Sequence, residues 1–507
     1  MSERTLEDRE DWSRVVRDRV AKLRALQERG VEPFAYGFSV THPTEEARGL
    51  LPEGAEEGET VRVAGRLVAL RDMGKSTFAH VADRSGRIQL YFRLNDLGAE
   101  TYGLLDLLDL GDWIGVEGPL FRTRTGEVTV RVRELRVLSK AVRPLPLGKE
   151  EVDEETGERR VHSGLADREA RYRQRYVDLA VSPETRQVFV TRARVISAIR
   201  RFLDERGFIE VETPVLQPMY GGAAARPFTT HHNALDIPLY LRIADELYLK
   251  RLIVGGMERV YEIGKDFRNE GMDRFHNPEF TMLEFYAAYF DYEDVMRLTE
   301  ELISTTVREA CGGASVTYGS DEIDFRAPFR RLPMYDALRE VGGVDVESLD
   351  EPALREHVAR LGVEGAAQMG RAKLIDELFG ALVEPKLIQP TFITDYPREM
   401  SPLAKPKRGN SQLTERFELI VAGKELVNAY SELNDPFDQR ERFEAQDRLR
   451  ALGDDEAPPL DEDFIRALEY GMPPTGGFGM GVDRLVMLLT NQSSIRDVVL
   501  FPTMRPE

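Results

Sequence analysis

The sequence predicts an α+β protein of at least two domains, in which a small N-terminal β-barrel precedes a larger domain of mixed helices and strands. The chain has 507 residues, whereas one compact domain usually holds about 100–200. Apolar side chains alternate with period two between residues 60 and 140, which is typical of strands, and no single period dominates the remainder. With 42% hydrophobic and 31% charged residues the chain can bury a core, so wholesale disorder is excluded.

The net charge and the number of cysteines exclude several classes of protein. Lys and Arg number 69 and Asp and Glu 89, a net charge of −20, which argues against nucleic-acid binding by the whole surface but leaves a local basic patch open. The single cysteine, Cys311, excludes a disulfide framework and a thiolate-rich metal site. No run of about 18 apolar residues is present to span a membrane, and the first residues lack an apolar signal segment. We therefore expect a cytoplasmic protein with no membrane partner.

Residues 1–58 are expected to form a helical N-terminal extension. Between residues 12 and 30, apolar residues recur at helical spacing and Gly30 is a suitable stop. That stretch has six Arg or Lys residues and two acidic ones, which fits either a solvated amphipathic helix or a contact with nucleic acid. Residues 37–60, with two prolines and an acidic run, predict a loop.

Residues 59–145 predict the barrel. Five alternating segments are separated by turn signals and interrupted by a helical stretch near 99–109, as in a small Greek-key barrel of the oligonucleotide-binding (OB) type. Residues 60–140 carry 13 basic and 10 acidic side chains, a net charge of +3. Such barrels bind single strands through a basic groove and aromatic side chains that stack on bases. Three aromatic residues are candidates for stacking, although packing in the barrel core explains each of them equally well: Phe78, Tyr91 and Phe92.

Residues 69–76 (ALRDMGKS) partly match a phosphate-binding loop. That chemistry requires a helix directly after the loop, whose backbone N–H groups hold the phosphate. The following residues, TFAHVAD, alternate like a strand instead, so we predict the tip of a hairpin.

Residues 146–175 predict an exposed linker, because a densely charged run follows two prolines. Residues 176–507 are then expected to form the larger domain. Within it, residues 291–385 are mostly helical in pattern and are bounded by strand-like segments, which predicts a helical insertion.

Residues 267–286 combine an arginine and a histidine with a strand-like segment, EFTMLEFY. Alternate residues share one face of a strand, so Phe280, Glu284 and Tyr286 are expected on the same side. A buried carboxylate such as that of Glu284 needs a cationic partner. Three further polar residues precede the strand and are expected nearby: Arg268, Glu270 and His276.

Residues 416–435 hold a second acidic cluster. Glu418 and Glu425 flank a predicted turn, and paired carboxylates at such a turn suit Mg²⁺ that bridges to phosphates. An exposed acidic hairpin is the alternative interpretation. Three residues then alternate along one face: Asn428, Tyr430 and Glu432.

Residues 476–490 contain four glycines followed by an apolar helical pattern. The spacing is not that of a dinucleotide-binding loop, and no βαβ unit surrounds it. Glycines allow the backbone to approach a flat ligand closely, while Arg484 offers charge and a stacking plane. A tight strand-to-helix packing element is the alternative.

Taken in order, these motifs resemble those of the class II aminoacyl-tRNA synthetases and, among them, the lysyl-tRNA synthetases. RGFIEVETPVL (206–216) resembles motif 1, residues 267–280 resemble motif 2 with Phe275 between Arg274 and His276, and GGFGMGVDR (476–484) resembles motif 3. The similarity covers about residues 60–507, apart from the linker near 148–163. It implies an OB-fold barrel that binds the anticodon and a catalytic antiparallel sheet flanked by helices.

The resemblance implies a lysine–tRNA ligase that uses ATP to convert L-lysine to lysyl-adenylate and transfers it to the 3′ end of tRNA(Lys), releasing AMP and pyrophosphate. Arg268 and Arg484 would be catalytic, because they neutralise phosphate charge during an in-line attack by the lysine carboxylate. Mg²⁺ would be held by Glu418 and Glu425. Residues expected to bind ATP are Arg268, Glu270, His276, Phe280, Glu418 and Arg484.

The same resemblance assigns the amino-acid and tRNA contacts. Family members are homodimers through motif 1, and Phe78 and Gln89 match positions that stack on and read a U-rich anticodon. Residues expected to bind lysine are Gly222 and Glu246 at the α-amine, Arg268 at the carboxylate, and Glu284, Tyr286, Asn428 and Glu432 around the side chain.

Three alternatives are weighed against this interpretation. An aspartyl- or asparaginyl-type synthetase shares the architecture, but its pocket would not be anionic like that of Glu284 and Glu432. A protein-lysyl transferase similar to the elongation factor P modifier would lack the barrel. An inactive RNA-binding paralogue would not need the full set of ATP and Mg²⁺ candidates.

Overall fold

A computed structural model describes two compact units of the chain, residues 1–182 and 183–507. The start of the expected extension (1–11) and part of the expected linker (153–158 and 163) lie outside the described residues. None of the helices in the described part of the chain is long and apolar enough to cross a membrane. The described residues are 12–152, 159–162, 164–363, 365–451 and 458–506.

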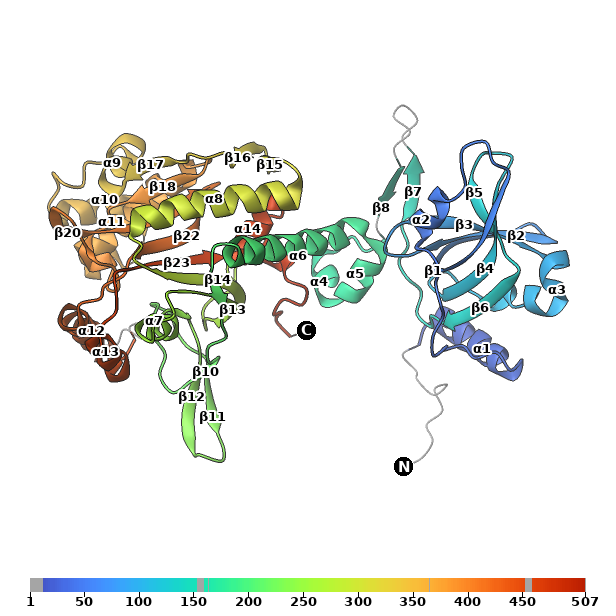
Figure 1. The fold of residues 1–507 in the computed structure, drawn as a ribbon, viewed down its shortest axis with the longest axis horizontal. Helices are drawn as coiled ribbons and strands as arrows, with labels where there is room; N and C mark the ends of the chain where they lie inside the picture. The colour runs from blue at the N-terminus through green and yellow to red at the C-terminus, as the bar shows by residue number, and fades with distance from the viewer. Residues whose placement is uncertain (1–11, 153–158, 163, 364, 452–457, 507) are drawn as a thin grey trace. The chain divides into compact units, whose positions relative to one another are not determined.

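The first unit contains the expected barrel (Figure 1). Its strands follow the order β1-β2-β3-β5-β4-β6, and β1 also pairs with β4, which closes the sheet. The alternation predicted from the sequence holds, since every second side chain of β2 and β3 is buried. The bounds are β1 Glu57–Asp72, β2 Ser76–Ala82, β3 Arg87–Arg93, β4 Trp113–Arg122, β5 Val128–Arg131 and β6 Glu134–Ser139, with α3 Leu94–Tyr102 and the 3₁₀ turn Leu105–Leu107 between β3 and β4.

Two details of the barrel differ from expectation. The stretch expected as one last strand is two, because β5 pairs with β3 and with residues 120–122 of β4, whereas β6 pairs with residues 113–117 of β4. Between β5 and β6 the chain passes close to the backbone of β4 at Gly118. A Cβ at that position would lie 1.9 Å from the carbonyl oxygen of Arg131, so only glycine fits there. Residues 69–76 form a hairpin tip as predicted, with Asp72 opposite Thr77.

The segments around the barrel are more structured than the sequence indicates. The expected first helix is α1, Arg14–Glu28, whose N-terminus is capped by the Ser13 side chain. The expected loop 37–60 contains a short helix, α2 (Thr44–Gly49), because the Asp83 carboxylate accepts hydrogen bonds from both the amide and the hydroxyl of Thr44 at 2.8 Å. The expected linker contains β7 Lys149–Val152, β8 Arg159–His162 and α4 Arg168–Arg173, and is followed by α5 Arg175–Val181.

The second unit is organised around a mainly antiparallel sheet, as expected. In its described part, eight strands follow the order β17-β18-β21-β22-β23-β14-β13-β9, and the outermost pairs β17–β18 and β13–β9 are parallel. The expected strand at 279–286 is β14. The bounds are β9 Ile209–Glu210, β13 Arg259–Phe267, β14 Glu279–Ala288, β17 Arg330–Pro333, β18 Thr391–Thr394, β21 Arg416–Val421, β22 Lys424–Ser431 and β23 Thr475–Gly481.

Helices cover this sheet on both faces (Figure 1). One face is largely apolar and packs on α6, α8 and α14 in the main core. The other face is partly covered by α7 and α13, whose apolar residues pack with Tyr286 and Ala288. The bounds are α6 Pro183–Asp204, α7 Glu246–Val254, α8 Tyr292–Cys311, α12 Pro436–Ala451, α13 Glu462–Glu469, α14 Val482–Leu489 and α15 Ile495–Val498.

The expected helical insertion at 291–385 is mostly helical, and its described part also contains three short strands. Its first helix, α8, belongs to the main core, and the strand β17 joins the central sheet. The later helices pack into a separate apolar cluster around Leu354 and Leu378. The remaining bounds are β15 Ser315–Tyr318, β16 Asp321–Asp324, α9 Met334–Ala337, α10 Glu351–Arg360 and α11 Arg371–Leu382, and elsewhere in the unit β10 Leu216–Gln217, β11 Thr229–His232, β12 Ile237–Leu241, β19 Pro406–Lys407 and β20 Asn410–Thr414.

Candidate active site

A cavity of about 510 Å³ opens on the sheet face opposite α6, α8 and α14. It arises from strict alternation, because odd-numbered residues of β14 such as Leu283 and Phe285 enter the core, whereas Glu284 and Tyr286 face the cavity. All of the candidates from the second unit line it. They are Gly222, Glu246, Arg268, Glu270, His276, Phe280, Glu284, Tyr286, Glu418, Glu425, Asn428, Glu432 and Arg484.

The glycines of β23 make room for the side chains of the neighbouring strands. Gly477 pairs with Tyr286 on one side and with Tyr430 on the other. A Cβ at Gly477 would lie 1.7 Å from Glu432 Oε1 and 2.7 Å from the ring of Tyr286. The sequence interpretation, that these glycines admit a flat ligand, missed this role at Gly477.

One end of the cavity is strongly acidic and buried. Glu284 and Glu432 are 5% and 1% exposed. Glu284 accepts hydrogen bonds from the Tyr286 hydroxyl at 3.0 Å and from the amide of Asp245 at 3.1 Å. The Tyr430 hydroxyl donates to Glu246 Oε2 at 2.7 Å. Residues from α7, β14 and β22 therefore form one anionic pocket.

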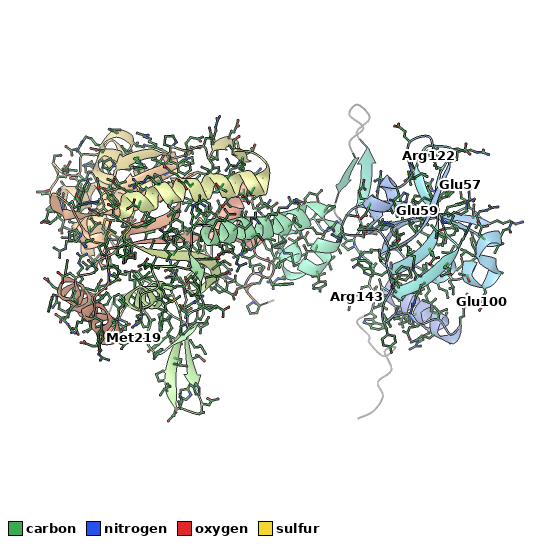
Figure 2. All side chains as sticks on the ribbon, viewed as in Figure 1. Glu57, Glu59, Glu100, Arg122, Arg143 and Met219 are labelled. Carbon is green, nitrogen blue, oxygen red and sulfur yellow. The ribbon has the colours of Figure 1, made fainter. Side chains whose placement is uncertain are left out.

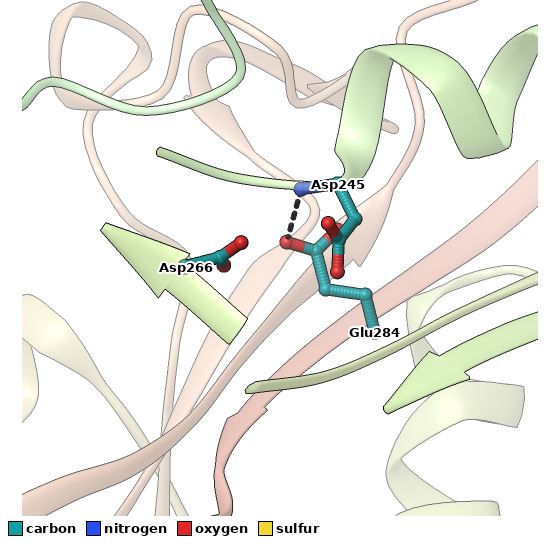
Figure 3. A group of neighbouring side chains, drawn as sticks. All are labelled: Asp245, Asp266 and Glu284. Carbon is teal, nitrogen blue, oxygen red and sulfur yellow. Dashed lines mark hydrogen bonds between the residues drawn. The ribbon is translucent and has the colours of Figure 1, made fainter. Parts of the chain in front are cut away.

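Glu284 belongs to a group of three buried carboxylates with Asp245 and Asp266 (Figure 3), whose oxygens lie within 4.8 Å of one another. Burial, reinforced by the charges of Asp266 and Glu246, raises the pKa of Glu284 to about 8. Burial likewise raises the pKa of Asp245 and Asp266 above the ordinary range. Arg242, whose Nη1 lies 2.8 Å from Asp245 Oδ1, supplies positive charge to the group.

A lysine of the chain itself lies beside the acidic end. Lys250 is fully buried, its Nζ is 2.5 Å from Glu246 Oε1, and it also pairs with Glu432. Lys250 was not expected from the sequence, although it follows Glu246 by four residues on one helix, a spacing that is typical of an ion pair.

The other end of the cavity carries cationic and aromatic groups. The guanidinium of Arg268 lies 5.1 Å from the ring centroid of Phe280. Arg484 Nη1 donates to the carbonyl of Glu425 at 2.7 Å, and Arg484 Nη2 lies 3.3 Å from His276 Nε2. Asp273 Oδ2, 2.8 Å from His276 Nδ1, orients that ring and was not anticipated. Planar, positively charged groups of this kind suit a phosphorylated nucleotide.

Glu418 and Glu425 line the same cavity from the hairpin of β21 and β22, whose register shifts between Leu419 and Ile420. Burial, followed by the charge of Glu425, raises the pKa of Glu418 to about 7, although Arg416 opposes this. A divalent cation would relieve the same repulsion, and two carboxylates are a donor set that fits Mg²⁺. The alternative of an exposed acidic hairpin is excluded for Glu418, whose side chain is 14% exposed.

The barrel of the first unit carries an aromatic surface that is half-buried. Phe78 stacks on Tyr91 with centroids 4.6 Å apart, and Tyr91 lies 5.8 Å from Phe121. Phe92, a stacking candidate from the sequence, is instead fully buried in the core. The Gln89 side chain donates to Glu127 and accepts from the Thr129 hydroxyl, both at 2.8 Å. The unanticipated Phe121 packs against Arg131.

Comparison with known proteins decides the family. The family described as "tRNA synthetases class II (D, K and N)" matches residues 167–505. The chain belongs to this family of class II tRNA synthetases. A second family, "OB-fold nucleic acid binding domain", matches residues 61–138 of the synthetase. The resemblance drawn from the three motifs is therefore confirmed, as is the expected α+β fold.

Several relatives of this synthetase carry the name "Lysine--tRNA ligase". The protein of Moorella thermoacetica is 56% identical, with 96% of this chain and 97% of the relative covered. That of Pelotomaculum thermopropionicum is 53% identical, with 98% and 96% covered. That of Carboxydothermus hydrogenoformans is 51% identical, with 98% and 99% covered.

Proposed function

We propose that this synthetase is a lysine–tRNA ligase that forms lysyl-adenylate from L-lysine and ATP, releases pyrophosphate, and transfers lysine to tRNA(Lys) with release of AMP. The observation that carries the proposal is Glu432 Oε1, a buried carboxylate oxygen that lines the cavity and has no hydrogen-bond donor within the described part of the chain. A buried acceptor without a donor costs stability unless a ligand supplies one. The ammonium of lysine is such a donor.

The acidic end accounts for the choice of amino acid. Glu284 and Glu432, with Tyr286 and Asn428, would surround the side-chain ammonium, while Glu246 and the Gly222 carbonyl would hold the α-amine. Aspartate would place a carboxylate against these acids, and asparagine would leave them without a cation, so both are disfavoured. Gly222 has φ +88°, and a Cβ there would lie 3.1 Å from Ala244 and 3.2 Å from Glu246, so a larger residue would crowd the start of α7.

The cationic end accounts for activation of the carboxylate. Arg268 would contact both the lysine carboxylate and the α-phosphate, and Glu270 the adenine. Phe280 and Arg484 would enclose that base, with His276 near the outer phosphates. Lysine already carries a nucleophilic carboxylate, so catalysis requires placement and neutralisation of charge rather than a protein base. Glu418 and Glu425 would hold Mg²⁺, which would supply positive charge at the triphosphate.

Surface residues of each unit support a proposed partner: tRNA for the first unit and a second copy of the chain for the second unit. Phe78 and Gln89 of the barrel would read the anticodon of tRNA(Lys) in the cytoplasm, since single-stranded bases stack on aromatic rings at a protein surface. A homodimer is supported by exposed apolar side chains in and near motif 1. These are Ile209, Val215, Leu216, Met219 (Figure 2), Leu235 and Ile237.

Aminoacylation of tRNA tests the proposal. The purified protein with ATP, Mg²⁺ and radiolabelled lysine should charge a tRNA(Lys) transcript but not a tRNA(Asp) transcript. Arg268→Ala should abolish lysine-dependent ATP–pyrophosphate exchange, because the α-phosphate loses its neutralising partner. Near-normal exchange by this variant would overturn the assignment of Arg268, and failure of the wild type to charge tRNA(Lys) would overturn the function.

A further inference from the structure

Lys250 is a buried cation among the acids proposed to bind the amines of the substrate. It lies on α7, one turn after Glu246, and its side chain is 0% exposed. Tyr430 and Phe464 flank its ammonium, with ring centroids 5.7 and 5.9 Å away. Water therefore does not solvate this charge, and its stability depends on the two carboxylates that it contacts.

The contacts of Lys250 divide the oxygens of these carboxylates in a specific way. Its Nζ lies 2.5 Å from Glu246 Oε1, while the Tyr430 hydroxyl donates to Glu246 Oε2. Its Nζ also pairs with Glu432 Oε2, which leaves Glu432 Oε1 without a partner in the described chain. Both carboxylates are thus fixed in orientation, and one oxygen is left to receive a ligand.

Charge balance gives Lys250 a second effect. Glu246, Glu284 and Glu432 line one cavity together with the neutral hydroxyls of Tyr286 and Tyr430. Although burial acts in the opposite direction, Glu246 and Glu432 raise the pKa of Lys250 above its usual value, so the ammonium stays charged. Burial raises the pKa of Glu432 well above its usual value, and the charge of Lys250 acts against this. Without that charge the Glu432 carboxylate would hold its proton more firmly and lose its attraction for a substrate ammonium.

We propose that Lys250 is a positioning residue for selection of the amino acid: it fixes the orientation of Glu246 and Glu432 and favours their charged form, so that they accept the two ammonium groups of lysine. This inference rests on the proposed function. Lys250 itself acts through the two carboxylates rather than by touching the reacting atoms.

Replacement of Lys250 by an uncharged residue of similar length tests the inference. In Lys250→Met, the lysine KM in ATP–pyrophosphate exchange should rise at least about tenfold at pH 7, because the buried partners of a charge are left unpaired. The KM for ATP should change less than about twofold, since the cationic end is unaltered. The rise in lysine KM should shrink as the pH increases from 6.5 to 8.5, because the unpaired carboxylates then lose their protons.

Two further variants separate positioning from stability. Lys250→Arg keeps the charge and should restore most of the lysine KM and its pH profile. Lys373→Met is a matched control, because Lys373 also bridges two carboxylates, Asp376 and Glu377, but on the surface of α11. It should leave both KM values unchanged. If Lys250→Met does not fold, Lys250→Gln, whose amide still donates to one carboxylate, carries the same expectation.

The outcomes separate this inference from the proposed function. The positioning role would be overturned by an unchanged or lower lysine KM in Lys250→Met. It would also be overturned if this variant lost the same fraction of active enzyme at every pH while its lysine KM stayed constant. In either case, lysine-dependent exchange by the wild-type protein would still support a lysine–tRNA ligase. A wild-type protein with no lysine-dependent exchange would overturn the function itself.

Discussion

Gly477 offers the sharpest steric test of the amino-acid pocket. In Gly477→Ala, the added Cβ would lie 1.7 Å from Glu432 Oε1 and 2.7 Å from Tyr286 Cε1. Non-bonded heavy atoms prefer about 3.5 Å, so the Glu432 carboxylate must move by roughly 2 Å. Glu432 is 1% exposed, so the surrounding residues leave it little space in which to move.

The expected cost follows from that displacement. Movement of Glu432 breaks its pair with Lys250 and withdraws the oxygen proposed to receive the substrate ammonium. A misplacement of about 1 Å in a positioned group can lower a rate about 100-fold. We therefore expect kcat/KM for lysine to fall about 100-fold, with the KM for ATP changed much less.

The assay is lysine-dependent ATP–pyrophosphate exchange, with thermal unfolding of each variant as a check on folding. Gly313→Ala is the control, because Gly313 is not among the residues that line the cavity and its Cβ would meet nothing closer than 3.9 Å, at the carbonyl oxygen of Ser315. It should keep the lysine KM within about threefold of the wild type. Equal losses of kcat/KM in the two variants, or a wild-type value in Gly477→Ala, would refute the steric reasoning.

Three further predictions concern the pH dependence, the barrel and the dimer. Because the pKa of Glu284 is raised to about 8, the folded protein binds more protons than the unfolded chain between about pH 5 and 8. The melting temperature without ligand should therefore fall as the pH increases from 5 to 8, and the rise in melting temperature on adding lysine should become larger. A melting temperature that does not change with pH would contradict this. Phe78→Ala should raise the KM for tRNA about tenfold without affecting ATP–pyrophosphate exchange, whereas Tyr36→Ala, at a fully exposed ring, should change neither. Leu216→Glu should shift sedimentation velocity from dimer to monomer and Leu361→Glu should not, and a wild-type monomer would remove the basis for the dimer.

Periodicity predicted the elements that alternate cleanly. The strand at 279–288 and the strands of the barrel form as expected because their apolar faces are continuous. Alternation also placed Glu284 and Tyr286 on one face correctly. The helix at 44–49 escaped prediction because Asp83, far along the chain, supplies its stabilising hydrogen bonds. The strands inside 291–385 are only four residues long, too short for a period to show.

In the site, as in the fold, contacts between residues that are far apart in the sequence could not be predicted. The family resemblance identified the residues of the cavity, but the register of the sheet determines which of them contact one another. Lys250 was missed because it stands among apolar residues of its helix and because its partner Glu432 lies 182 positions away in the sequence. Phe92 and Tyr91 are adjacent in the sequence, and only the direction of curvature of the barrel places the first in the core and the second on the surface.

The central claim is that a buried anionic pocket beside the nucleotide end selects a substrate with a side-chain ammonium. The most direct measurement is ATP–pyrophosphate exchange by the wild-type protein with each of the twenty amino acids in turn. Lysine should support rapid exchange and the other nineteen at most about 1% of that rate. Exchange driven by aspartate or asparagine, or by no amino acid at all, would contradict the account.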